Sequence, residues 1–272
     1  MTGVAPTRLG QRIRTAFGGR LPLTIPAGVA LLLLLVPLLA LLLRVDWPGL
    51  PGRLDSPVVL DALRLSALTT SVSLLVTVAV GTPLAWLLAR ASGSGATWLR
   101  ALVTVPLVLP PVVGGVALLM AYGRAGVVGG PLRDWLGVTV PFTTVAVVLA
   151  EVFVAMPFYV ITVEGAMRGL HRGYDEIAAT LGASPWRTFT RVAVPMVAPG
   201  VAAGAALAWA RALGEFGATI TFAGSFPGRT QTAPLAVYAA LEQDPQAAVA
   251  LSTLMLLICV VVLVVFRQRW VP

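Results

Sequence analysis

Few side chains in this 272-residue sequence could act as nucleophiles, general bases or metal ligands. All nineteen basic residues are arginine, and His171 and Cys259 are the single histidine and the single cysteine. The absence of lysine excludes a lysine-bearing phosphate-binding loop and a Schiff-base lysine. One histidine and one cysteine cannot build a Cys/His zinc or iron–sulfur site. The sequence therefore predicts no enzyme: we expect no catalytic residue, no metal site and no cofactor in this chain.

Charged side chains within apolar stretches are the remaining candidates for chemistry. Arg211 and Glu215 are four residues apart, so a helix would place them on one face, where they could pair. Pairing lowers the cost of placing either charge in a membrane. Glu151 lies in the middle of another apolar stretch and is a second embedded carboxylate.

The composition indicates that membrane helices position these residues. Hydrophobic residues make up 58% of the chain and charged residues 11%, whereas a soluble domain carries about a quarter charged residues. Several runs approach or reach the roughly 20 apolar residues that a helix needs to cross a bilayer. The predicted fold class is an all-α integral membrane protein with six transmembrane helices, at 25–43, 63–89, 101–122, 143–163, 196–219 and 247–266.

These spans define the expected domain organisation. Residues 1–24 form a cytoplasmic N-terminal segment, and residues 25–272 form a single transmembrane domain that includes a cytoplasmic segment at 164–195. Three prolines in the third span, at 106, 110 and 111, predict a kink or a late start. Asp244 and Pro245 suit the N-cap and first position of the last helix.

The distribution of arginine predicts the orientation. With the N-terminus inside, twelve of the nineteen arginines lie in cytoplasmic segments and six in external ones. Cytoplasmic loops of membrane proteins carry an excess of basic residues, so both termini are expected in the cytoplasm. The expected location is the cell membrane (inner or plasma), with several crossings. The basic charge then reflects topology and contact with anionic lipids rather than nucleic acid.

The stretch "DEIAATLGASPWRTFTRVAVP", residues 175–195, is polar and interrupted by glycine and proline. It predicts two short helices joined by a tight turn. Gly182 suits the end of the first helix, because glycine accepts positive φ. Ser184 and Pro185 suit the N-cap and first position of the second. The small residues at the turn would let another surface approach closely, so this stretch is predicted to insert into a cleft of another protein.

Residues 176–178, Gly182 and residues 192–195 resemble the E-A-A…G…I-x-L-P loop of ATP-binding cassette (ABC) importer permeases. Ile177, Val192 and Val194 depart mildly from that pattern, which has Ala, Ile and Leu there. In that family the loop is a coupling helix that docks into the ATP-hydrolysing subunit. The resemblance implies the type I ABC importer permease fold, with ATP and Mg²⁺ bound by a separate partner chain. The ATPase-coupling residues it implies are Tyr174, Glu176, Ile177, Ala178, Ala179, Leu181, Gly182, Ala183, Ser184, Pro185 and Pro195.

Residues 106–130 and 210–238 look like the molybdate/tungstate branch of these permeases, and the resemblance covers most of residues 63–266. The sulfate/thiosulfate branch has similar G-E-F-G segments and remains an alternative. Family resemblance implies these partners: a second copy in a homodimer, two ABC ATPase subunits, an extracytoplasmic oxyanion-binding protein and membrane lipids. An ion-coupled secondary transporter is the alternative of another class, but it would have no use for a docking loop.

A tetrahedral dianion needs a water-lined path with hydrogen-bond donors or helix N-termini. The candidate pathway or gate residues are Arg211, Gly214, Glu215, Gly217 and Thr219. The Arg211–Glu215 pair would be part of an external gate, or it would be structural and tighten the packing of helices; both interpretations stay open. Glu151 would repel a dianion, so a helix contact is favoured for it.

Overall fold

The computed structural model describes residues 21–170 and 173–266, and every regular element within them is helical. The chain divides into two units, Met1–Asp46 and Trp47–Pro272. The first unit contains α2 (Leu21–Leu43), which begins four residues before the predicted first span. Most of the predicted N-terminal segment, and His171, lie outside the described residues.

The second unit carries the other described helices. In chain order they are α3 (Leu50–Leu54), α4 (Pro57–Arg90), α5 (Ser94–Val108), α6 (Pro111–Tyr122), α7 (Gly129–Leu136), α8 (Thr144–Arg168), α9 (Gly173–Thr180), α10 (Pro185–Thr188), the π-helical turn η1 (Phe189–Ala193), α11 (Val194–Met196), α12 (Ala198–Leu213), α13 (Gly217–Phe222), α14 (Ala233–Gln243) and α15 (Pro245–Phe266). Over residues 21–170 and 173–266, α2, α4, α8 and α15 are long and apolar enough to cross a membrane. Two bent helix pairs raise the number of candidate spans to six.

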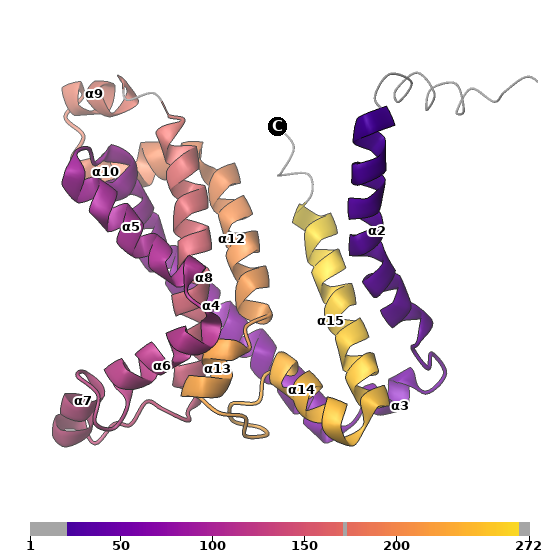
Figure 1. Cartoon of the computed structure of the whole chain (residues 1–272). Coiled ribbons are helices and arrows are strands. Elements are labelled where there is room, and N and C mark those ends of the chain that lie inside the picture. Colours follow the sequence, from indigo (N-terminus) through magenta and orange to yellow (C-terminus); the bar gives the residue numbers. More distant parts are fainter. Residues whose placement is uncertain (1–20, 171–172, 267–272) are drawn as a thin grey trace, which may run out of the picture. The chain divides into compact units, whose positions relative to one another are not determined.

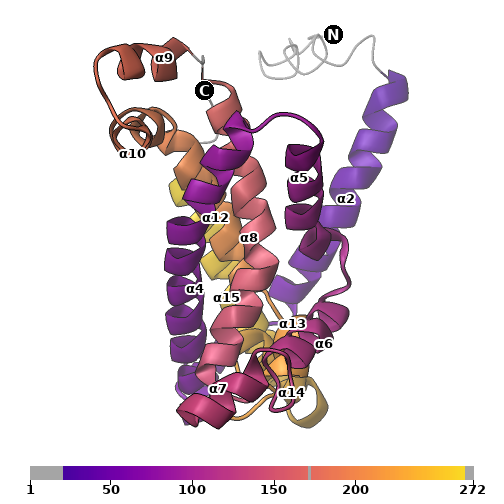
Figure 2. The ribbon, with the colours of Figure 1, turned by 90° about the vertical axis from the view of Figure 1, so that its left-hand side faces the viewer.

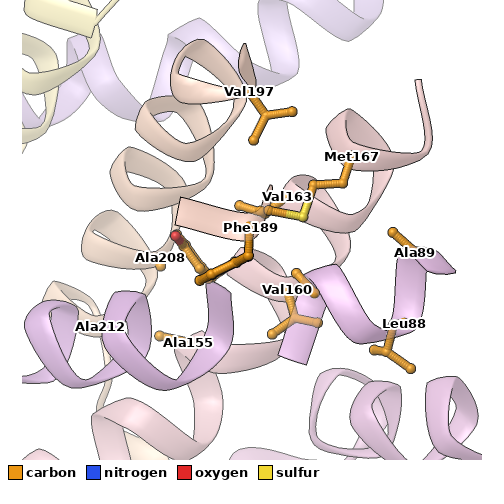
Figure 3. Packing of buried hydrophobic residues seen from close by; sticks show 12 residues of the cluster. Leu88, Ala89, Ala155, Val160, Val163, Met167, Phe189, Val197, Ala208 and Ala212 are labelled. Atoms are coloured by element: carbon orange, nitrogen blue, oxygen red, sulfur yellow. The ribbon is translucent and has the colours of Figure 1, made fainter. Parts of the chain in front are cut away.

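The centre of the second unit is a packed group of α4, α8 and α12 (Figures 1 and 2). Its largest buried cluster joins side chains of these three helices to Phe189 of η1. Figure 3 shows Phe189 among residues such as Leu88 of α4, Val163 of α8 and Ala208 of α12. The helices α9 and α10 lie at one end of this group, and α7, α13 and α14 lie at the opposite end (Figures 1 and 2).

Polar side chains fasten α4 to α8. Thr69 and Ser73 of α4 donate hydrogen bonds of 2.8 and 2.7 Å to the two carboxylate oxygens of Glu151 in α8. Further along the same pair, the hydroxyls of Thr82 and Tyr159 are 2.6 Å apart. Glu151 thus makes a contact between helices, the role that the sequence favoured. Such bonds between helices are favoured where no water can satisfy the groups.

The predicted third span, 101–122, is two helices rather than one. α5 begins at Ser94, seven residues early, and ends at Val108. α6 starts at Pro111 after a bend of 114°. The predicted kink is confirmed and is larger than expected, because Pro110 and Pro111 lack N–H donors and disfavour a helical conformation in the residue before each.

The predicted fifth span, 196–219, is also divided. A bend of 77° separates α10 and α11 from α12. α12 ends at Leu213, and α13 starts at Gly217. The single-helix prediction for this span was wrong because apolar composition alone does not reveal a chain break at Gly214. The predicted Asp244 cap of α15 is confirmed: Asp244 Oδ1 accepts from the N–H groups of Gln246 and Ala247 at 3.0 and 3.2 Å.

Candidate functional site

We call residues 173–193, which comprise α9, the turn 181–184, α10 and η1, the elbow. α9 ends at Thr180, and Gly182 follows it with a φ of 78°, in the left-handed region that glycine tolerates. Gly182 N–H donates to Ala179 O at 3.0 Å and Ala183 N–H to Ala178 O at 2.9 Å, the pair of bonds of a Schellman cap. Ser184 Oγ then accepts from Arg187 N–H at 3.3 Å and caps α10. The two caps fix the angle between the helices.

Apolar side chains remain uncovered on the elbow. Tyr174, Ile177 and Leu181 follow helical spacing along one face of α9, and all three are exposed, Leu181 by 82%. Trp186 of α10 is 69% exposed. Ala178, one turn after Tyr174, is buried. An exposed apolar surface on an otherwise polar segment is typical of a protein-binding site.

Two side-chain contacts hold the elbow to the end of α4. Arg90 binds Asp175 of α9 through both carboxylate oxygens, and its Nη2 lies 3.1 Å from Oδ1. Arg90 Nη1 also donates to Met167 O of α8 at 3.2 Å. The ring of Trp86, one turn earlier in α4, packs on Phe189 with centroids 5.5 Å apart. Sequence spacing does not predict these partners; the only local signal is a cation, Arg90, at the C-terminus of a helix.

The same end of the unit carries a second arginine network. Arg100 of α5 lies 2.6 Å from Glu164 of α8 and donates to the terminal carbonyls Leu88 O and Ala91 O of α4. Arg168 reaches the same Glu164 oxygen at 2.7 Å. Together with Arg90, these arginines line a polar cavity of about 300 Å³. They neutralise buried carboxylates and helix C-termini where α4, α5 and α8 meet.

At the opposite end, the break between α12 and α13 holds the predicted ion pair. Arg211 Nη2 lies 2.6 Å from Glu215 Oε2, and the Glu215 side chain is 1% exposed. Glu215 Oε1 accepts from Ala218 N–H at 2.8 Å and so caps the start of α13. The carboxylate therefore stabilises both the pair and the helix that follows the break.

The other predicted gate residues do not share one surface. Gly214 borders an apolar cavity of about 420 Å³ between Phe216, α14 and α15. Gly217 instead packs against Pro111 of α6, where an added Cβ would lie 2.8 Å from Pro111 Cβ. Thr219 is fully buried, and its hydroxyl has no hydrogen-bond partner among the described residues. The structure thus brings Arg211 and Glu215 together and directs Gly217 into the α6–α13 contact.

Comparison with known proteins identifies the class. Residues 81–271 match the model of a family described as the binding-protein-dependent transport system inner membrane component. The fold is also similar to a crystal structure of a bacterial ABC transporter involved in the import of the acidic polysaccharide alginate. That match has a TM-score of 0.71 and 16% identity and covers 95% of this chain and 96% of the other.

Individual relatives agree with this class. The chain is 47% identical over 238 residues to the "Molybdenum transport system permease protein ModB" of Mycobacterium tuberculosis, covering 88% of this chain and 90% of the relative. It is 33% identical to the "Probable sulfate transport system permease protein cysT" of Zygnema circumcarinatum, covering 87% and 83%. The chain therefore belongs to the binding-protein-dependent transport system inner membrane components. It is a multi-pass inner-membrane permease with the fold of ABC importer permeases.

Proposed function

We propose that this chain forms the translocation pathway for molybdate in an ATP-driven importer. The observation that carries the proposal is its 47% identity, over 88% of its length, to a molybdenum transport permease. Tungstate has the same tetrahedral shape and charge and is included in the proposal. The weaker similarity to a sulfate permease makes sulfate the second candidate.

The proposed assembly contains two copies of this chain, two ATPase subunits and an oxyanion-binding protein. Two copies are proposed because one chain offers too few spans to enclose a path on its own. In the proposed orientation both termini and the elbow face the cytoplasm, and α13 and α14 face outward. The exposed apolar residues of the elbow supply the surface that the ATPase would cover.

In the proposed mechanism, ATP binding and hydrolysis by the partner move the elbow, and the spans tilt to open the path to alternate sides. The coupling residues are those implied by the loop resemblance, with Tyr174, Ile177 and Leu181 as the apolar contacts. The Arg211–Glu215 pair is the candidate outer gate, since it lies at a helix break opposite the elbow. ATP and Mg²⁺ are assigned to the partner chain.

The substrate is tested with the complex reconstituted in liposomes together with its binding protein. We expect molybdate to stimulate ATP hydrolysis. We also expect it to move from the side that carries the binding protein to the side that lacks it. Sulfate and tungstate are compared under the same conditions. Stimulation by sulfate with none by molybdate would replace the substrate assignment, and uptake without any ATPase would refute the ABC mechanism.

Coupling is tested by variants of the elbow. Gly182→Pro, Glu176→Arg and Leu181→Asp should leave membrane insertion intact and abolish co-purification with the ATPase. The matched control is Thr97→Asp, which adds a charge at an exposed site near the start of α5. Co-purification of the three elbow variants with a fully active ATPase would count against the coupling assignment.

A further inference from the structure

The chain joins the elbow to α12 through an irregular, bent connection. η1 is a π-helical turn, which interrupts the regular hydrogen-bond pattern of an α-helix. α11 then ends at Val197, and the chain bends by 77° before α12. Pro199 lies in the first turn of α12, where it leaves no N–H to bridge the joint. Because of this 77° bend, a displacement along α10 and α11 is not directed along the axis of α12.

An ion pair and a ring contact join the elbow to α4, and Phe189 also packs in the cluster that α4 shares with α8 and α12. Arg90 of α4 donates two charge-assisted hydrogen bonds to Asp175 of α9. This bidentate geometry fixes both the distance and the orientation of the two side chains. Phe189 in the second half of the elbow packs on Trp86 and Trp186, with centroids 5.5 Å apart in both pairs. Trp86 and Arg90 are one helical turn apart. Both halves of the elbow are therefore attached to one face of the last turns of α4.

The far end of α4 holds α14. Ser66 Oγ, which is buried, accepts from Ala233 N–H at 2.7 Å and thereby caps the first turn of α14. The preceding turns of α4 add apolar contact, since Val59 and Ala62 share a buried cluster with Ala236 of α14. Ser66 and Arg90 are about 36 Å apart along the helix axis, at about 1.5 Å per residue.

Between these ends α4 is stiffened by α8. The helices α4 and α8 run side by side (Figure 2). The bonds from Thr69 and Ser73 to Glu151, and the contact of Thr82 with Tyr159, join them. The contact at Thr82 is next to Pro83, where the ring removes one backbone hydrogen bond of α4. α8 thus supports α4 beside the weakest point of the helix.

We propose that α4 is the rod that carries motion between the ATPase-binding elbow and α14 at the opposite end of the permease. Arg90 and Trp86 are its attachment points for the elbow, and Ser66 is its attachment point for α14. This inference rests on the proposed function, in which the elbow receives the ATPase and α14 lies on the side of the binding protein. Both sides then communicate through one helix.

The test uses the complete complex in liposomes and the variants Arg90→Ala, Asp175→Ala, their double variant, and Ser66→Ala. Three quantities are measured: co-purification of the ATPase, ATP hydrolysis without binding protein, and the stimulation of hydrolysis by molybdate-loaded binding protein. We expect co-purification to persist and stimulation to fall at least about fivefold, the lower end of ordinary coupling between sites. The double variant should be no worse than the worse single variant, because both residues act through one contact.

Matched variants separate transmission from a loss of structure. Arg168→Ala removes an arginine at the same end but leaves Glu164 paired with Arg100, so stimulation should stay unchanged. Arg90→Lys keeps the charge without the bidentate grip and should restore part of the stimulation. Each variant is also compared with the parent for its thermal unfolding midpoint in detergent.

Three outcomes would overturn the inference. Full stimulation in Arg90→Ala and Ser66→Ala would show that α4 is not the route. A loss of stimulation that tracks the loss of ATPase co-purification would assign Arg90 to the docking surface. Loss of stimulation that tracks a lowered unfolding midpoint would assign a structural role. Failure of the proposed function is distinguishable, because the parent complex itself would then show no stimulation.

Discussion

Arg211 and Glu215 form an ion pair of 2.6 Å at the point where α12 ends, and the Glu215 side chain is 1% exposed. The second oxygen of Glu215 accepts from Ala218 N–H and begins α13. Either open interpretation, gate or structural tie, therefore predicts that the carboxylate and the guanidinium are unequal in their effect on stability.

Arg211→Ala should destabilise the fold more than Glu215→Gln. The first variant leaves a buried carboxylate without its cation, a loss of about 3 kcal/mol for a buried pair. The second keeps an oxygen to accept from Ala218 and leaves an arginine that is partly exposed, so the loss should be about 1 kcal/mol. Denaturant unfolding in detergent measures both free energies. The double variant Arg211→Ala/Glu215→Gln should be more stable than Arg211→Ala alone, because it has no unpaired buried carboxylate. If it is not, the ion pair does not explain the larger loss in Arg211→Ala.

Glu151→Leu should lower the free energy of unfolding by about 1–3 kcal/mol. Thr69 and Ser73 would lose a buried acceptor, although Ser73 can still donate to Val148 O at 3.2 Å. Glu151→Gln should cost less, because an amide accepts from one hydroxyl and donates to the other. The same unfolding measurement distinguishes the two variants. Equal losses would mean that the hydrogen bonds between α4 and α8 contribute little.

Gly115→Ala should lower the free energy of unfolding by about 1–3 kcal/mol, because it overpacks the contact between α6 and α13. A Cβ at this position would lie 2.7 Å from Thr221 Cβ and 2.8 Å from Ala218 O, closer than side chains normally approach. The control is Gly165→Ala in α8, where an added Cβ meets nothing within 4 Å and helix propensity favours alanine. Thermal unfolding midpoints should move in opposite directions. A parallel shift of both would contradict the close packing of α6 on α13.

Arg100→Ala should lower the free energy of unfolding more than Arg168→Ala. Arg100 satisfies Glu164 and two terminal carbonyls of α4, so its removal should cost about 2 kcal/mol. The Arg168 side chain is 49% exposed and binds only the shared Glu164 in the described part of the chain, so its loss should cost at most about 0.5 kcal/mol. High salt should reduce the stability loss in Arg168→Ala further, because that ion pair is exposed, and should leave the loss in Arg100→Ala unchanged. Similar losses in both variants would show that the carbonyl contacts of Arg100 do not matter.

Local sequence determined the features that depend on a single turn of chain. Gly182, Ser184 and Asp244 form the helix caps that their residue types predict, and Arg211 pairs with Glu215 at the predicted spacing. The low share of charged residues and the long apolar runs predicted the all-α membrane class, because a helix needs roughly 20 apolar residues to cross a bilayer. The loop motif of residues 176–195 also indicates the family to which the chain belongs.

Tertiary structure decided what depends on residues far apart in the chain. Arg90 meets Asp175 across 85 positions, and Glu151 meets Thr69 across 82; no spacing rule predicts such partners. The break in the fifth expected span also depended on packing, since Gly217 and Gly115 let α13 cross α6 closely after the chain breaks. Caps and i, i+4 pairs form within one segment, whereas contacts between helices depend on how all the segments pack together.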